Sequence, residues 1–461
     1  ISIQEAITAA RHLLLNIKDG SDFEIIKNSR VEYQGILLAY AFELEPAGYV
    51  VAPAHSELPP VIAYSLVSRF GETNNANPLY RLIQADLSLK LANADKMLSA
   101  WACENEIRWQ ALIASSTVAI TNPDFEQWPA SGDGWLKSNW TQNPPYNNMC
   151  PMDPVTGIRS YAGCPATAMA QIMNYHGTTN ESRFSDDDDY FHNYAGRQYW
   201  IDDDSDYADF PSFPELNVYL DSLDAHYRAN QPVTNQDKAA MTFACGVAAR
   251  QVFTSQGSGT FGVDQAYNAY LRFGCSSVDL LDSTDSQLYE RLKQNIKDTL
   301  PAHLAIVDES WSTGHNVVVD GYNTDEYYHL NFGWGGSYNG WYLLPDEIPY
   351  ELTVIEGVVV DIQKGTMTGV EDLINLHSEI MICPNPVHEN AMVHFNLQSP
   401  ESVCFHLYNS SGEMVLTHKS LNLPSGNHSF SLDLSRIPAG FYIYSFDFRN
   451  ESITGKLIKA Q

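Results

Sequence analysis

The chain has 461 residues, and its 56 acidic and 26 basic side chains give a formal net charge of −30. Such a charge repels phosphate backbones and anionic membrane surfaces, so we expect no nucleic-acid partner. The length exceeds what one hydrophobic core can serve, and a 44% share of apolar residues supports about two to four domains. A membrane span needs a run of about eighteen apolar residues, and the sequence contains none, which predicts no span.

The chain does not open with a basic and then apolar signal, and we expect Ile1 to follow a removed leader. The seven cysteines are scattered, odd in number and without the paired spacing of a zinc site. At least one of them is therefore unpaired. In a chain that otherwise looks extracellular, a free thiol is a candidate nucleophile, and a buried inert cysteine is the alternative interpretation.

Residues 1–114 are predicted to form a compact α+β unit. The capping box Ser2-x-x-Glu5 opens an amphipathic helix, and alternating apolar residues predict a hairpin within Tyr40–Ala52. Asn77-Pro78 predicts the start of one long helix that extends through Trp101.

Residues 115–134 lack periodicity and are rich in proline and glycine, which predicts an exposed processing linker. Residues 135–364 mix helical with strand-like patterns, and residues 365–378 form a second linker. Residues 379–461 are strand-like throughout, as in Val393-Phe395-Leu397, and predict a small all-β sandwich.

Two acidic clusters, Asp186–Asp189 and Asp202–Asp209, are candidate calcium ligands. They lack the spacing of an EF-hand, with its central glycine and terminal glutamate. We therefore expect solvated loops here, and no required metal or cofactor.

The segment Gly163-Cys164-Pro165 opens an apolar run that Gly177 ends, which predicts a helix beginning at Pro165. Cys164 then lies at the helix N-terminus, where unpaired N–H groups favour the reactive thiolate. The alternative is a small residue that caps a packed helix. A base from elsewhere in the chain decides between the two, because His176 lies roughly 18 Å away along the same helix.

Two strand-like segments, Gly314–Asn323 and Glu326–Phe332, predict a hairpin. If its turn is centred on Asn323, His315 faces Asn331 with Cβ atoms about 5 Å apart. The asparagine carbonyl would fix the tautomer of the imidazole and leave its second nitrogen for the thiol. This interpretation depends on the register, and a structural histidine is the alternative for both His315 and His329.

The run from Gly333 to Trp341 places glycines beside aromatic residues, which favours either a Trp-walled substrate cleft or a series of turns. Upstream, the side-chain amide of Gln142 could form an oxyanion hole together with the Cys164 backbone N–H. A glutamine by itself does not indicate such a site.

Together these motifs resemble the streptopain (interpain-like) family of papain-like cysteine peptidases over residues 1–364. The resemblance rests on Gly163-Cys164-x-Ala166-Thr167-Ala168, Gly314-His315-x-x-Val318-x-Asp320-Gly321 and Asn331-x-Gly333-Trp334-Gly335-Gly336. It implies a papain-like catalytic domain over residues 135–364, with Cys164 as nucleophile, His315 as base, Asn331 as its orienting residue and Gln142 in the oxyanion hole. The substrate-binding residues that it implies are Gly163, Gly314, Trp334, Gly335 and Gly336. Pro165 and Phe332 depart from the family's pattern.

Residues 1–114 resemble the inhibitory propeptide of that family, and residues 379–461 are similar to a type IX secretion C-terminal sorting domain. Sandwiches of the latter kind also serve as adhesion or carbohydrate modules. The resemblance implies export from a Gram-negative bacterium to the medium or the cell surface, with the secretion machinery as a partner.

The resulting hypothesis is a zymogen that hydrolyses protein and peptide substrates through a thioester and prefers an apolar residue at the second position before the cleaved bond. One alternative is acyl transfer to an amine, because that reaction shares the thioester intermediate. The other is an inactive surface-binding protein whose sandwich carries the function.

Overall fold

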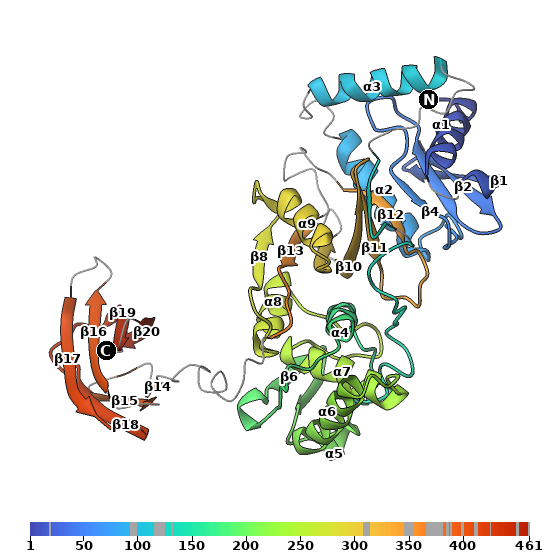
Figure 1. Ribbon diagram of the computed structural model, residues 1–461. Coiled ribbons are helices and arrows are strands. Elements are labelled where there is room, and N and C mark those ends of the chain that lie inside the picture. Colours follow the sequence, from blue (N-terminus) through green and yellow to red (C-terminus); the bar gives the residue numbers. More distant parts are fainter. Residues whose placement is uncertain are drawn as a thin grey trace. The chain divides into compact units, whose positions relative to one another are not determined.

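The chain divides into two compact units, residues 1–365 and 366–461 (Figure 1). The computed structural model describes residues 1–17, 20–92, 99–114, 125–130, 132–307, 314–344 and 355–365 of the first unit. In the second it describes residues 381–383, 387, 390–397, 401–409, 414–424, 426–448 and 451–459.

One long antiparallel sheet runs through the first unit in the order β1-β2-β3-β4-β12-β11-β10-β9-β13-β8, with β5 paired to β10. Its strands are β1 (Glu24–Tyr33), β2 (Ile36–Glu45), β3 (Tyr49–Pro53), β4 (Ala63–Ser65), β5 (Gln127–Trp128), β8 (Asp279–Asp282), β9 (Ala302–Val307), β10 (Gly314–Asn323), β11 (Tyr327–Asn331), β12 (Gly340–Leu343) and β13 (Ile355–Val360). The pairing of β4 with β12 joins the first 114 residues to the rest of the unit through backbone hydrogen bonds. The sheet is therefore continuous across the predicted boundary at residue 114.

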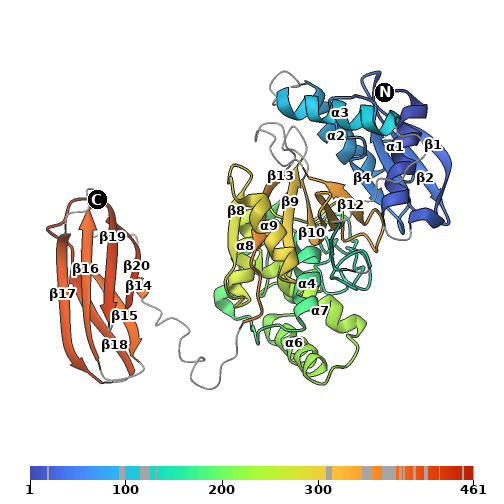
Figure 2. The same cartoon turned by 45° about the horizontal axis from the view of Figure 1, so that its top comes forward.

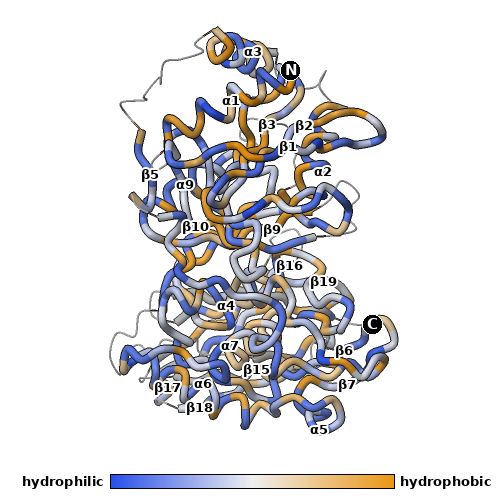
Figure 3. The backbone as a smooth tube through the Cα atoms, turned by 90° about the vertical axis from the view of Figure 1, so that its right-hand side faces the viewer, coloured by the Kyte–Doolittle hydropathy of each residue, from blue (hydrophilic) through white to orange (hydrophobic). Residues whose placement is uncertain are grey.

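The first 114 residues contain the predicted capped helix and hairpin. α1 (Ile3–Asn16) begins after Ser2 and carries the capping box with Glu5, and a 3₁₀ turn, η1 (Gly20–Asp22), follows it. β2 and β3 pair with Phe42 opposite Val50, and Figure 3 shows the apolar character of this part of the sheet. The alternation of apolar residues was sufficient to predict this hairpin, because its two strands follow each other in the sequence.

Where one long helix was expected, the structure has two: α2 (Pro78–Ala92) and α3 (Ser99–Ala114). The predicted helix also included Leu98, which lies outside the described residues. α3 packs against the segment before α2, where the indole N–H of Trp109 donates to the Leu58 carbonyl at 2.8 Å. The Asn105 amide likewise donates to the Glu57 carbonyl at 3.0 Å. These tertiary contacts, which local periodicity does not reveal, give α3 its own direction.

The predicted linker, residues 115–134, is partly built into the sheet. β5 pairs with the end of β10, and the Trp128 ring stacks on Tyr322 with centroids 6.1 Å apart. Ladder hydrogen bonds and aromatic contact therefore outweigh the turn-forming residues nearby. Residues 115–124 lie outside the described residues, and the linker's role in processing stays a prediction.

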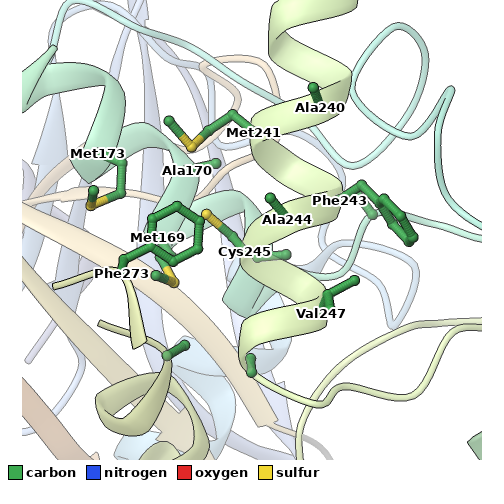
Figure 4. Packing of buried hydrophobic residues seen from close by; sticks show 14 of the residues in the cluster. Met169, Ala170, Met173, Ala240, Met241, Phe243, Ala244, Cys245, Val247 and Phe273 are labelled. Atoms are coloured by element: carbon green, nitrogen blue, oxygen red, sulfur yellow. The ribbon is translucent and has the colours of Figure 1, made fainter. Parts of the chain in front are cut away.

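The other helices of the first unit gather beside the sheet (Figures 1 and 2). They are α4 (Cys164–His176), α5 (Ser205–Ala208), α6 (Phe213–Arg228), α7 (Asn235–Ala248), α8 (Val263–Arg272) and α9 (Leu288–Lys297), with a 3₁₀ turn η3 (Asp186–Asp188) and a hairpin of β6 (Phe191–Tyr194) and β7 (Arg197–Trp200). α4 packs against α7 on one side and β10 on the other. Figure 4 shows Met169 and Met173 of α4 facing Met241 and Cys245 of α7 in a fully buried cluster. Burying these side chains fixes α4, and with it the position of Cys164.

β10 and β11 form the predicted hairpin, but with a different register. Asn331 faces Val318, not His315. The turn is centred near residue 325, where the Asn323 side chain accepts from the Tyr327 N–H at 3.1 Å, and the register shifts between Val319 and Gly321. The later turn and this irregularity together move Asn331 three positions along β10 from the predicted partner.

The second unit contains the predicted small β-sandwich. One sheet has the order β14-β15-β18 and the other β17-β16-β19-β20. The strands are β14 (Met381–Cys383), β15 (Asn390–Leu397), β16 (Glu401–Asn409), β17 (Met414–Leu423), β18 (Gly426–Asp433), β19 (Gly440–Phe448) and β20 (Glu451–Lys459). Alternate residues such as Val393, Phe405 and Phe446 form its core. Among the described residues of the chain, no helix is long and apolar enough to cross a membrane.

Candidate active site

Cys164 is the first residue of α4, as the sequence predicts. Pro165 follows it in the first turn, and Gly177 ends the helix in a left-handed conformation with φ 60°. Proline lacks a backbone N–H that would go unpaired in the first turn, and glycine tolerates the left-handed conformation, so both ends are encoded locally. The Cys164 side chain is half-buried at the positive end of the helix dipole.

The loop before Cys164 is shaped by Gly163 and Gln251. Gly163 is buried with φ 86°, and a Cβ atom there would lie 2.7 Å from the Gln251 Oε1. The Gln251 Nε2 donates to the Ala162 carbonyl at 2.7 Å, while the Ala162 N–H donates to the Gln142 carbonyl at 3.0 Å. Gly163 is thus packed against Gln251 within the loop. The Gln142 carbonyl binds Ala162, which lies two residues before Cys164 in the sequence.

The hydrogen-bond partner of the Cys164 sulfur on β10 is Asn316. The Asn316 Nδ2 donates to the Sγ atom at 3.9 Å. Burial raises the pKa of the Cys164 thiol, while the backbone N–H and side-chain amide of Asn316 lower it in part. The thiol is therefore protonated at neutral pH in this form of the protein.

His315 lies one residue earlier on β10 and is bound elsewhere. Its Nε2 lies 2.9 Å from the Phe332 carbonyl oxygen, which only accepts, so the proton is on Nε2 and Nδ1 is the free base. The pKa of His315 is lowered to about 4. Burial is the main cause and His303 also lowers it, while the hydrogen bond to the Phe332 carbonyl raises it in part. A neutral imidazole and a neutral thiol cannot form the ion pair that activates a cysteine nucleophile.

The predicted register that set Asn331 opposite His315 is wrong, and the orienting role of Asn331 stays a prediction. The buried Asn331 Nδ2 donates to the Ser138 carbonyl at 3.0 Å, and its Oδ1 accepts from the Gln171 Nε2 at 3.2 Å. The cause is the register described above. A carbonyl still fixes the tautomer of His315, but it is the backbone carbonyl of Phe332.

The aromatic and glycine-rich segment after β11 lies beside His315 and contacts the first 114 residues. Trp334 stacks on the His315 ring, and the exposed Gly335 donates its N–H to the Trp140 carbonyl at 3.0 Å. The Gly336 carbonyl accepts from the Ser68 hydroxyl at 2.8 Å. A serine of the first 114 residues, located before α2, therefore binds the candidate substrate-binding segment.

A cavity of about 180 Å³ opens beside His315. One wall comes from β9, β10 and the aromatic segment, and the other from α2. The lining residues are Pro78, Arg81, Leu82, Ala85, Ile306, Val307, Gly314, His315, Phe332 and Trp334. Gly314 thus lies at the cavity as an exposed residue, and α2 covers what is otherwise an open apolar recess.

Several carboxylates of the acidic clusters bind protein groups. Asp188 pairs with Arg272, the Asp189 carboxylate accepts from the Asp202 N–H at 2.9 Å, and Asp202 accepts from the Phe213 N–H. Within the part of the chain that the structure describes, no three histidine, cysteine or acidic side chains are grouped to hold a metal ion. The cysteines whose side chains are described are all free: Cys103, Cys150, Cys164, Cys245, Cys275 and Cys404.

Sequence reasoning missed three polar residues at this site: Gln171, His303 and Asn316. Alternation along β10 carried the signal for Asn316, since neighbours on a strand point to opposite faces and one of the two had to face α4. Gln171 lies on the helix that begins with Cys164 and binds Asn331. His303 could not be predicted from its sequence neighbours, because the pairing of β9 with β10 brings it to the site.

A free cysteine at the start of a central helix, packed on a strand that carries a histidine within an α+β fold, fits the class of papain-like cysteine peptidases. Comparison with known proteins specifies it further. Residues 140–342 match the sequence model of the Peptidase C10 family, and residues 381–460 match the Secretion system C-terminal sorting domain. The chain therefore contains a Peptidase C10 family domain, followed by a secretion sorting domain.

The relatives include a thiol protease/hemagglutinin PrtT of Porphyromonas gingivalis, 25% identical over 407 residues. That alignment covers 84% of this chain, but this chain spans only 43% of the relative. Streptopain of Streptococcus pyogenes is 23% identical over 356 residues, which cover 70% of this chain and 78% of streptopain. The solved prointerpain A fragment of Prevotella intermedia is 19% identical with a TM-score of 0.49, covering 73% of this chain and 99% of that one.

Proposed function

We propose that this chain is the latent form of a secreted cysteine endopeptidase, activated when residues 1–114 are removed. The observation that carries the proposal is that the N-terminus of α4 places Cys164 against β10, beside the residue that follows His315. The two groups are on adjoining elements, and each is bound to another partner. A local rearrangement of β10 and the aromatic segment would bring imidazole and thiol together.

In the proposed reaction His315 takes the proton of the Cys164 thiol, and the resulting thiolate attacks the carbonyl carbon of a peptide bond. The Gln142 side chain and the Cys164 backbone N–H stabilise the oxyanion. His315 protonates the leaving amine as the C–N bond breaks, and a water molecule that His315 deprotonates then hydrolyses the thioester. Acid–base help of this kind contributes about 10²–10⁴-fold, and no metal or cofactor takes part.

The contacts of the first 114 residues support latency. α2 covers the cavity beside His315, Ser68 binds the Gly336 carbonyl, and β4 extends the sheet at β12. With α2 removed, the recess bounded by Ile306 and Phe332 would accept an apolar side chain. We therefore propose an apolar residue at the second position before the cleaved bond.

The sorting domain supports export, and we propose the type IX route of a Gram-negative bacterium, with release to the medium or attachment to the cell surface. The secretion machinery would bind residues 379–461, and protein and peptide substrates would bind at the cavity. An inactive surface-binding protein has no need of the covered cavity or of an unpaired cysteine at the helix start.

The test compares wild type with Cys164→Ala after limited proteolysis, using an unfolded protein as substrate. We expect Cys164→Ala to reduce the rate of hydrolysis by more than about 10³-fold, since the other catalytic residues act through the nucleophile. Cys404→Ala is the matched control, because it removes a free thiol that lies outside both residues 1–114 and α4. Undiminished hydrolysis by Cys164→Ala would exclude this nucleophile, and transfer to an added amine would support the acyl-transfer alternative.

A further inference from the structure

The Cys164 sulfur lies at the half-buried end of a row of hydrogen bonds that the proposed mechanism does not use. The Asn316 Nδ2 is 3.9 Å from the sulfur, and the Asn316 Oδ1 is 2.7 Å from the Nε2 of His303. The Nδ1 of His303 is in turn 3.0 Å from the hydroxyl of Tyr270. The row therefore crosses from α8 through β9 and β10 to the start of α4.

Chemistry fixes the direction of every bond in this row. An amide oxygen only accepts, so His303 carries its proton on Nε2 and donates to Asn316. The Nδ1 of His303 must then accept, and the Tyr270 O–H donates to it. Each donor thus points toward the sulfur, and hydrogen bonds aligned in one direction polarise and strengthen one another.

Burial makes the row rigid. His303 and Tyr270 have no exposed surface, and burial lowers the pKa of His303 to about 4, so that it stays a neutral donor and acceptor. The Tyr270 ring also lies edge-on to the His303 ring, with centroids 5.8 Å apart. Asn316 is consequently held with its N–H group toward Cys164 whether or not His315 is nearby.

The geometry points to Asn316, supported by His303 and Tyr270, as a positioning residue that stabilises negative charge on the Cys164 sulfur. This inference rests on the proposed function, in which that sulfur is the nucleophile. A donor built into the sheet would keep the thiolate accessible while His315 enters and leaves hydrogen bonding with the sulfur. It would also fix the rotamer of the thiol in the latent form, where His315 binds the Phe332 carbonyl.

The titratable groups around this row come from each element packed on it. They are His315 on β10, His303 on β9, Tyr270 on α8 and, beyond Tyr270, the buried Cys245 and Cys275. Burial raises the pKa values of Tyr270, Cys245 and Cys275, so all three are neutral at neutral pH. A change in the titration of Cys164 on altering Asn316 therefore reports the amide and not a distant charge.

The test measures the pKa of Cys164 in the full uncut chain. Thiolate ultraviolet absorbance is recorded against pH, and each variant is compared with the same variant carrying Cys164→Ser, so that only this sulfur contributes. For Asn316→Ala we expect a higher pKa, with about 3- to 10-fold less thiolate at a fixed pH below it. Tyr270→Phe preserves the packing and removes only the outer donor, and it should lower the thiolate fraction by about 2-fold.

Asn295→Ala is the matched control, because it removes a buried amide on α9 that binds Asp361. It should leave the titration of Cys164 unchanged. An unchanged or lowered pKa in both Asn316→Ala and Tyr270→Phe would overturn the inference, even if one variant folds poorly. Hydrolysis separates the two proposals: activity retained in Cys164→Ala removes the proposed function, whereas an unaltered titration with that activity lost removes only the role of Asn316.

Discussion

The indole ring of Trp334 lies nearly parallel to the imidazole of His315, with an interplanar angle of 18° and centroids 4.1 Å apart. Phe332 also stacks on His315, with centroids 6.0 Å apart. Aromatic rings on this side exclude water from the imidazole, and burial is the largest cause of its lowered pKa. The aromatic segment therefore holds the general base neutral in the latent chain.

Trp334→Ala should raise the pKa of His315 from about 4 toward its ordinary range near 6.5, because water reaches the ring and stabilises the imidazolium. The measurement is the pH titration of the His315 ring protons by nuclear magnetic resonance in the uncut chain. Trp200→Ala is the control, since Trp200 is exposed on β7. An unchanged pKa in Trp334→Ala would show that other groups bury His315.

His303→Gln should make the chain less sensitive to acid. The pKa of His303 is about 4 in the folded chain, and the unfolded chain takes up the proton near pH 6.5, so stability is lost as pH falls from 6.5 to 4. The loss amounts to roughly 3 kcal/mol for a group this deeply buried. Denaturant unfolding at pH 7 and pH 4.5 checks this, and parallel pH dependences for wild type and variant would contradict it.

Ser65→Ala combined with Ser68→Ala should loosen the aromatic segment from the first 114 residues. Ser65 donates to the Asn339 carbonyl and Ser68 to the Gly336 carbonyl, each at 2.8 Å. Two lost hydrogen bonds cost about 1–3 kcal/mol, which raises the open population by about 5- to 150-fold.

Hydrogen exchange of peptides covering residues 333–340 measures this opening in the uncut chain. Ser88→Ala is the control, because that hydroxyl bonds only within α2, to the Ala85 carbonyl. Exchange in the double variant as slow as in wild type would show that the two serines do not hold the segment.

Gly163→Ala should destabilise the chain by about 1–3 kcal/mol, since φ is 86° and the new Cβ atom would lie 2.7 Å from Gln251. Gly157→Ala is a matched control: its φ is 70°, and nothing lies within 4 Å of its Cβ position. Denaturation midpoints of the two variants separate crowding from backbone strain. Equal losses in the two variants would mean that crowding against Gln251 contributes nothing.

Much of the fold could be predicted because short-range patterns encode it. The capping box at Ser2 opened α1 where expected, and the proline and glycine around α4 placed Cys164 at its start. Strand alternation predicted the sandwich of the second unit. Each of these features depends on residues within one or two turns of each other, where side-chain type alone decides the backbone conformation.

The features that could not be predicted depend on distant pairings. The helix was expected through Trp101, and α3, which carries Trp101, is held by a contact of Trp109 with the distant Leu58 carbonyl. Asn331 was assigned to His315 from an assumed turn, but the actual turn lies later in the chain, and Asn331 binds Gln171 instead. A shift of a few positions along a strand changes the partner of every side chain, and no local pattern reports it.

The sequence by itself determined which groups are present and which element carries each: a thiol that opens a helix, an imidazole and an amide adjacent on a strand, and an apolar face for each core. Only the tertiary structure decided which of them meet. The start of α4 faces Asn316 and not His315, because the packing of α4 between α7 and β10 selects one face of the strand. Burial then set the pKa values of both Cys164 and His315, because desolvation depends on every segment that covers a group and not on its neighbours in the chain.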